Sequence, residues 1–209
     1  YAHNVACTPF PLNKMRIALT KQEADLLRQT EAEILTMSPG TDDIRIKQKL
    51  DSFFWEKLPA TGLGDLIKGV RPIGGRRKVA ALHRFADTYT QALAKWVVVG
   101  DSITDAQMLQ TVEEAGGLAI AFNANQYALP YATMGLASTH ISDLMEVLQA
   151  WAKGQRQAVE KAVREKETAG GKGDRDYFHW LSGRKDIAAV LEIHQRLRRL
   201  VREEAGKLG

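Results

Sequence analysis

The sequence predicts an α/β protein with a Rossmann-like parallel sheet flanked by helices, a helical cap-like module and C-terminal helices. Two observations carry this prediction. Continuous apolar runs at residues 96–100 and 118–122 are typical of strands that are buried on both faces. Helical patterns at residues 76–95 and 106–115 alternate with these runs. Such an order indicates parallel strands joined by helices that cover the faces of the sheet.

The alternation continues toward the C-terminus. Residues 134–137 are expected to form a third, short strand, and residues 141–167 one long helix. Glycines within residues 169–173 indicate a flexible linker. Beyond it, apolar residues recur every three or four positions, which predicts an amphipathic helix at residues 187–204 that packs its stripe against protein. His194 lies on that stripe, so we expect a core histidine there rather than a ligand.

The N-terminal third of the chain is predicted to be mostly helical. Thr20 and Glu23 have the spacing of a capping box, which predicts the start of a helix. Ser-Pro-Gly at residues 38–40 breaks the chain. The apolar side of residues 43–58 predicts a second helix, and residues 63–70 form a short amphipathic segment.

These elements divide the chain into three parts. Residues 1–19 and 71–150 are expected to form the α/β core. Residues 20–70 would be a helical cap-like insertion, and residues 151–209 a C-terminal helical extension. The chain begins with Tyr rather than Met, and residues 5–8 resemble a strand with nothing before it. We therefore expect the core to be incomplete at its N-terminus, although a processed start would look the same.

Composition excludes several classes of protein. Of the 209 residues, 44% are hydrophobic and 26% are charged, a balance typical of a globular domain rather than a disordered chain. No apolar run approaches the roughly 18–20 residues that cross a bilayer, and no secretory signal opens the sequence. Cys7 is the single cysteine, which excludes an internal disulfide framework and a cysteine-based zinc site. We expect a cytoplasmic protein that does not contact a membrane.

Positive charge is concentrated at the C-terminus. Residues 1–150 contain 15 Lys and Arg against 16 Asp and Glu, whereas residues 151–209 contain 14 against 9. A basic helix can bind nucleic acid or an acidic partner. Here glutamates are interleaved with the cations, which favours a solvated helix face. We therefore expect no specific nucleic-acid binding, and the C-terminal helices offer a surface for a homo-oligomer.

Two carboxylates follow the apolar strand at residues 96–100. Asp101 comes directly after Gly100, at the carboxyl end of the strand, where open α/β sheets bind their ligands. Asp105 comes four residues later, at the start of the next helix. Carboxylates that converge at such an edge suit Mg²⁺, which uses one or two of them together with water and substrate phosphate. The competing interpretation is that both residues cap the helix and complement its dipole.

A glycine pair and a lysine precede the same strand. Gly74 and Gly75 belong to a loop, and Lys78 lies at the start of the helix that leads into the strand. A helix start can direct backbone amides and an ammonium group toward one phosphate. An isolated lysine would more simply be a solvated surface residue, so the prediction for Lys78 depends on its sharing an edge with Asp101 and Asp105.

Together these residues resemble the C-terminal signature of the haloacid dehalogenase-like (HAD) superfamily. That signature is a lysine, an apolar strand running into Gly-Asp-x-x-x-Asp, and a helix. Here it reads Lys78, then residues 97–99, then residues 100–105. Residues 114–125 are similar to the strand and loop that follow the signature in phosphoserine-phosphatase-like members. A more specific resemblance, over about residues 71–150, is to the uncharacterised archaeal-type predicted hydrolases of this superfamily.

The resemblance implies a magnesium-dependent phosphomonoesterase that acts on a small phosphorylated metabolite through an aspartyl-phosphate. Asp101 and Asp105 are the implied metal residues, Asp101 directly and Asp105 through water or by orienting a ligand. Lys78 would neutralise the phosphoryl group and the nucleophile. The resemblance also implies that a set of residues around these binds phosphate or substrate, namely Gly74, Gly75, Lys78, Ser102 and Asn123.

One part of the family pattern is missing. The superfamily nucleophile lies in an Asp-x-Asp motif after a first strand, and no such strand and motif are visible in this sequence. Residues 174–176 have the Asp-x-Asp spacing but follow a glycine-rich stretch, and Asp42-Asp43 follows Ser-Pro-Gly. We therefore expect this chain to lack its nucleophile. The alternative is a non-catalytic HAD-like scaffold that uses its C-terminal helices for interactions.

Other phosphate-binding and hydrolase signatures fail. Residues 69–74 have the outer glycines of a Walker motif, but Gly75-Arg76 stands where that motif has Lys-Ser/Thr. Residues 62–64 read Gly-Leu-Gly without a preceding strand, which argues against a dinucleotide fingerprint. The nucleophile elbow of a serine hydrolase is also absent from the sequence.

Overall fold

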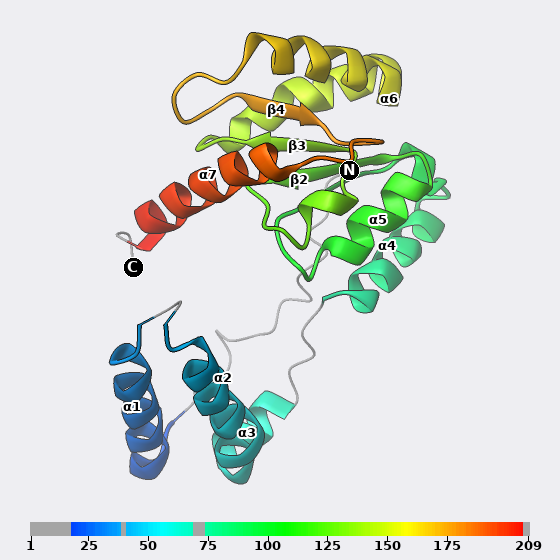
Figure 1. The fold of residues 1–209 in the computed structure, drawn as a ribbon. Helices are drawn as coiled ribbons and strands as arrows, with labels where there is room; N and C mark the ends of the chain where they lie inside the picture. Colours follow the sequence, from blue (N-terminus) through cyan, green and yellow to red (C-terminus); the bar gives the residue numbers. More distant parts are fainter. Residues whose placement is uncertain (1–17, 39–40, 69–73, 207–209) are drawn as a thin grey trace. The chain divides into compact units, whose positions relative to one another are not determined.

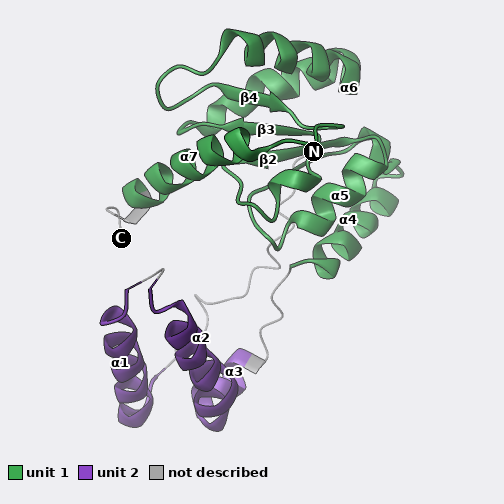
Figure 2. Cartoon of the chain, viewed as in Figure 1, with its two compact units in different colours: residues 1–6, 73–209 green, residues 7–72 purple. Residues whose placement is uncertain are grey.

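A computed structural model describes residues 18–38, 41–68 and 74–206, shown as coloured ribbon in Figure 1. The chain divides into two compact units, one formed by residues 7–72 and the other by residues 1–6 and 73–209 (Figure 2). The break after residue 72 lies close to the predicted boundary between residues 70 and 71.

A four-stranded sheet forms the centre of the larger unit (Figure 1). Strands β1 (Val97–Gly100), β2 (Leu118–Phe122) and β3 (Met134–Ala137) are parallel and adjacent in that order. Strand β4 (Tyr177–Trp180) pairs antiparallel with β3. The α/β fold class and the three parallel strands are therefore confirmed. The strand expected near residues 5–8 lies outside the described residues.

Side chains alternate between the two faces of the sheet and fill two separate cores. Ala119 and Ala121 of β2 belong to one core, whereas Leu118 and Ile120 belong to the other. This alternation follows from the two-residue period of a strand and explains why the sequence shows a continuous apolar run. Both faces of β2 are covered, whereas Val99 of the edge strand β1 is 42% exposed.

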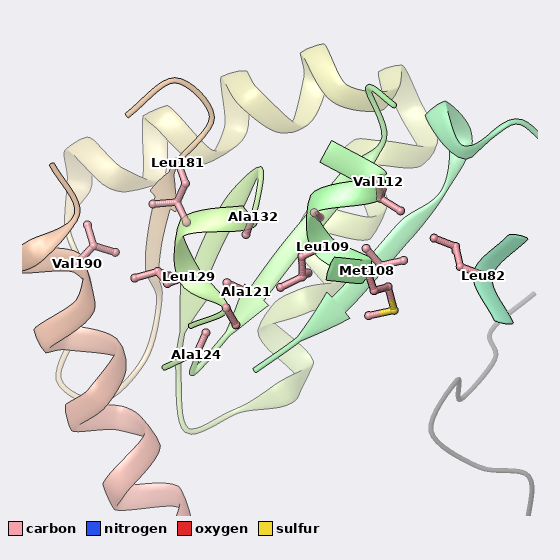
Figure 3. Close-up of a cluster of buried hydrophobic side chains, with 13 residues drawn as sticks. Leu82, Met108, Leu109, Val112, Ala121, Ala124, Leu129, Ala132, Leu181 and Val190 are labelled. Atoms are coloured by element: carbon pink, nitrogen blue, oxygen red, sulfur yellow. The ribbon is translucent and has the colours of Figure 1, made fainter. Parts of the chain in front are cut away.

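Three helices contribute to the first core. They are α4 (Arg76–Thr88), α5 (Ala106–Glu114) and α7 (Ala188–Gly206). Figure 3 shows Leu82 of α4, Met108 of α5 and Val190 of α7 among the buried side chains of this core. The predicted C-terminal amphipathic helix therefore packs its stripe on its own domain, and Leu197 is completely buried.

Helix α6 (Leu144–Ala169) covers the other face of the sheet and follows a 3-10 turn at Ile141–Asp143. Sequence periodicity predicts one continuous helix here, but Gly154 and Gln155 leave helical geometry, with Gln155 at φ 50°. The element therefore consists of two helical arms joined at a kink. The left-handed residue at the kink is Gln155, whereas Gly154 has an extended φ of −161° that any residue can adopt.

The region beyond residue 150 is part of the sheet-bearing unit and includes a strand that the sequence analysis missed. Helix α6 runs through residues 150 and 151 without interruption, so no boundary falls there. The stretch expected to be a linker leads through a Lys172–Arg175 bridge into β4. With only four residues and a histidine in its centre, β4 carries too short a pattern to distinguish from a loop.

The smaller unit is helical, as predicted. It contains α1 (Lys21–Leu35), α2 (Asp43–Ser52) and α3 (Gly62–Lys68), with a π-helical turn at Phe53–Lys57 and a 3-10 turn at Leu58–Ala60 between α2 and α3. The capping box is confirmed, because Thr20 and Glu23 exchange both expected hydrogen bonds. Glu23 also accepts a hydrogen bond from the N–H of Leu63 at 2.8 Å, which ties α1 to α3. Within the described ranges, no helix is long and apolar enough to cross a membrane.

Candidate active site

The candidate site lies at the carboxyl end of β1, where the chain turns sharply into α5. Gly100 is the last residue of the strand, and a Cβ at this position would come 2.4 Å from the Cβ of Asp105. Only glycine leaves room for the side chain of Asp105 to fold back against the strand end. Packing against Asp105 therefore explains why a glycine opens the Gly-Asp-x-x-x-Asp pattern.

Asp105 is buried and organises the loop between β1 and α5. Its Oδ2 accepts hydrogen bonds from the backbone N–H groups of Asp101 and Ser102 and from the Ser102 hydroxyl, each at 3.1 Å. Its Oδ1 accepts from the ammonium of Lys78 at 2.5 Å. Burial opposes ionisation of this carboxyl group, but the hydrogen bonds from Lys78 and from the loop outweigh that effect. The pKa of Asp105 therefore lies below its ordinary value.

Lys78 reaches Asp105 from the first turn of α4. Gly75 precedes this helix at φ 51°, a left-handed conformation that favours glycine, and its N–H donates to the carbonyl of Thr104 at 2.9 Å. Gly74 packs against the side chain of Thr104, where an added Cβ would have a 3.2 Å contact. The glycine pair thus seats the start of α4 on the β1–α5 loop, and this contact brings Lys78 to Asp105.

The structure therefore brings most of the predicted site residues together. Lys78, Asp101 and Asp105 share one edge of the sheet, as predicted from the sequence. Ser102 is partly exposed and donates to Asp105, while its hydroxyl lies 3.0 Å from that of Thr104. Gly74 and Gly75 contact the same loop through Thr104.

Asn123 has a different role from the expected one. Its side-chain amide donates to the carbonyl of Ser138 at 2.8 Å and accepts from the N–H of Ser138 at 3.0 Å. The side chain is buried, and both of its polar groups are used to join the ends of β2 and β3. This arrangement gives Asn123 a structural function and leaves substrate binding by its side chain without support.

Asp101 has a partner that the sequence analysis missed. Arg198 of α7 donates from Nη1 to the Asp101 carboxylate at 2.5 Å and to the Asp101 carbonyl at 2.9 Å. It also donates to the carbonyl of Asn123 at 3.0 Å. Asp101 itself is about half exposed, with 50% of its side chain accessible. The only sequence signal for this contact is that Arg198 stands beside the apolar stripe, four residues after His194.

His194 anchors the same helix next to the site. Its ring is completely buried, and its Nδ1 accepts a hydrogen bond from the N–H of Ala124 at 3.0 Å. Burial, together with the nearby ring of His179, lowers the pKa of His194 to about 3. The prediction of a core histidine is therefore confirmed, and this histidine is neutral near pH 7.

The donor set suits a divalent cation held largely by water and phosphate. Asp101 presents a half-exposed carboxylate at the sheet edge, whereas Asp105 has both oxygens occupied by Lys78 and the loop. Within residues 18–38, 41–68 and 74–206, no three metal-ligating side chains cluster. A hydrated Mg²⁺ that takes one protein carboxylate fits this set, while a fully dehydrated cation does not.

The two other acidic pairs noted in the sequence are engaged elsewhere. Asp174 pairs with Arg196, and Asp176 lies 3.7 Å from the guanidinium of Arg175. Both precede β4, which β2 and β3 separate from β1 in the sheet. Asp42 belongs to the smaller unit, where it accepts hydrogen bonds from Ser38 and Arg45.

Comparison with known proteins gives one structural relative. No protein family matches the sequence, and no curated protein matches it either. The chain is similar in structure to gene product AF1437 from Archaeoglobus fulgidus, with a TM-score of 0.66 and 25% sequence identity. The similarity covers 93% of this chain but only 56% of that protein, so this chain spans little more than half of its relative's length.

Proposed function

We propose that this chain carries the lysine and acidic residues of a magnesium-dependent phosphomonoesterase of the HAD type, which acts on a small phosphorylated substrate. The observation that supports the proposal is the Lys78–Asp105 pair beside a half-exposed Asp101 at one strand end. The C-terminal signature of the HAD hydrolases, which this chain resembles, consists of such a lysine and two such acidic residues.

Each residue has a distinct part in the proposed reaction. Asp101 would hold Mg²⁺ through its exposed carboxylate, and the cation would supply charge stabilisation for the transferring phosphoryl group. Lys78 donates one of its three N–H groups to Asp105, which holds its ammonium charge at the loop that carries Asp101. Asp105 positions the loop by accepting the N–H groups of Asp101 and Ser102.

The attacking group in this proposal is a carboxylate that this chain does not supply. Its oxygen attacks phosphorus and forms an acyl phosphate while the P–O bond to the alcohol breaks, and the leaving alkoxide takes a proton from solvent. Water then cleaves the acyl phosphate, which returns the carboxylate and releases inorganic phosphate. This chain alone is therefore expected to hydrolyse phosphate esters at the background rate.

A non-catalytic HAD-like scaffold is the second candidate. The observation in its favour is that both acidic residues are paired with cations of the chain itself, Asp105 with Lys78 and Asp101 with Arg198. These two ion pairs have no net charge in the absence of metal and substrate. A scaffold, which binds neither, needs no further charge at this position.

An assay of the complete gene product distinguishes the phosphatase from the scaffold. Its hydrolysis of p-nitrophenyl phosphate should be measured with Mg²⁺ and with a chelator, next to that of this chain alone. The phosphatase proposal predicts turnover that needs both Mg²⁺ and the complete protein. Turnover that persists in chelator contradicts the metal mechanism, and a complete protein without any turnover of phosphate monoesters supports the scaffold.

A further inference from the structure

Arg198 lies across the end of β1 and has a contact pattern that bears on the proposed metal site. Its Nη1 atom donates to three oxygens, the carbonyls of Asp101 and Asn123 and Oδ2 of Asp101. Only 14% of the Arg198 side chain is accessible. The guanidinium group therefore lies in a partly buried position between the ends of β1 and β2.

Two features hold this guanidinium group independently of the Asp101 side chain. First, two of its three acceptors are backbone carbonyls. Second, the helix that carries it is anchored nearby, because His194 accepts from Ala124 and Leu197 is completely buried. Arg198 is therefore a fixed neighbour of Asp101.

The two oxygens of the Asp101 carboxylate therefore differ in their hydrogen bonds. Oδ2 is bound to Arg198, whereas no hydrogen bond from the described part of the chain reaches Oδ1. Half of the Asp101 side chain is accessible, so this carboxylate is open to a cation from solvent. A cation that binds both oxygens would have to displace the guanidinium group.

We infer that Arg198 restricts Asp101 to one coordinating oxygen and so makes the site select Mg²⁺ over Ca²⁺. Ca²⁺ takes six to eight oxygen ligands and often binds a carboxylate through both oxygens, whereas Mg²⁺ is octahedral, keeps its waters and accepts single oxygens. The inference rests on the proposed function, because it assumes that Asp101 is the metal residue. Arg198 acts through Asp101 and is a positioning residue.

The test is to titrate this chain with Mg²⁺ and, separately, with Ca²⁺. Each titration is monitored by two-dimensional ¹H–¹⁵N NMR. The amide signals of Ser102 and Asp105 report binding at Asp101, because both groups belong to its loop. NMR measures the weak affinities expected of a single carboxylate. In the unaltered chain, Mg²⁺ should bind more tightly than Ca²⁺.

Replacement of Arg198 by methionine should reduce this preference. Arg198→Met frees Oδ2 and removes a positive charge, so the affinity for Ca²⁺ should rise about tenfold and that for Mg²⁺ about threefold. Arg198→Lys should keep the preference, since its ammonium group can still donate to Oδ2. Arg199→Met is the matched control, because Arg199 is exposed on the same helix. If Arg198→Met does not fold, Arg198→Leu, which also lacks a donor, replaces it, with the same expected change.

The outcomes separate this inference from the proposed function. An unchanged ratio of Ca²⁺ to Mg²⁺ affinity in folded Arg198→Met overturns the inference, as does an equal change in Arg199→Met. If the ratio is unchanged while the complete gene product shows Mg²⁺-dependent hydrolysis, only the role of Arg198 fails. If neither cation shifts the loop amides in any variant, both the inference and the metal role of Asp101 fail.

Discussion

Lys78 and Asp105 form an ion pair between the first turn of α4 and the loop after β1, and both side chains are almost completely buried. The two residues are 27 positions apart in the sequence. Their pairing joins the glycine loop before α4 to the strand end that carries Asp101. The geometry of the candidate site therefore depends on one buried contact.

Removal of the lysine should destabilise the fold. Lys78→Met leaves the Asp105 carboxylate buried without its cation, which costs about 3–5 kcal/mol for a buried pair. Lys185→Met, at an exposed position, should change the free energy of unfolding by less than about 0.5 kcal/mol. Urea unfolding of both variants checks this prediction, and equal midpoints would contradict it.

Gly100 should not tolerate even a methyl group. Gly100→Ala places a Cβ 2.4 Å from that of Asp105, so either the loop or the strand end must move. Overpacking of this kind costs about 1–3 kcal/mol. The substitution should also shift the amide signals of Asp101 and Ser102, which donate to Asp105. Val99→Ala, at an exposed site on the same strand, is the control and should leave those signals in place.

His194 should make the protein sensitive to mild acid. Its pKa is about 3 in the folded protein and has an ordinary value of 6.5, so the unfolded chain binds more protons between these values. Stability should therefore fall as the pH drops below 6.5, by about 2 kcal/mol from this residue at pH 5.

The variant His194→Gln should lose this pH dependence, because a glutamine oxygen can accept from Ala124 without titrating. His83→Gln is the control at an exposed histidine. Free energies of unfolding at pH 7 and pH 5 give the comparison. An equal loss of stability at pH 5 in the unaltered protein and in His194→Gln would show that other groups dominate.

Much of the fold could be predicted because its signals are local. The strands at residues 97–100 and 118–122 are apolar throughout, and a buried parallel strand needs no alternation. Strand β4 could not be predicted, since its pairing with β3 is fixed by tertiary contacts around a four-residue segment. The kink at Gly154 was also missed, because a single glycine within a helical pattern is often tolerated.

The candidate site could be predicted only where its residues lie close to one strand. Asp101 and Asp105 follow β1 directly, and Lys78 precedes it by one helix. Arg198 comes 97 residues after its partner Asp101, and its position beside the apolar stripe does not identify that partner. The family resemblance implies a substrate role for Asn123, whereas its amide bonds to Ser138 inside the protein.

The rate of phosphate-ester hydrolysis by the complete gene product with Asp101→Asn tests the central claim most directly. The substitution removes charge from the proposed metal residue, so the Mg²⁺-dependent rate should fall by about 100-fold or more. Asp105→Asn should have a smaller direct effect, because that carboxylate bonds to Lys78 and the loop. Asp87→Asn, an exposed control on α4, should keep the full rate. A complete protein that hydrolyses phosphate esters equally well with Asp101→Asn would contradict the account.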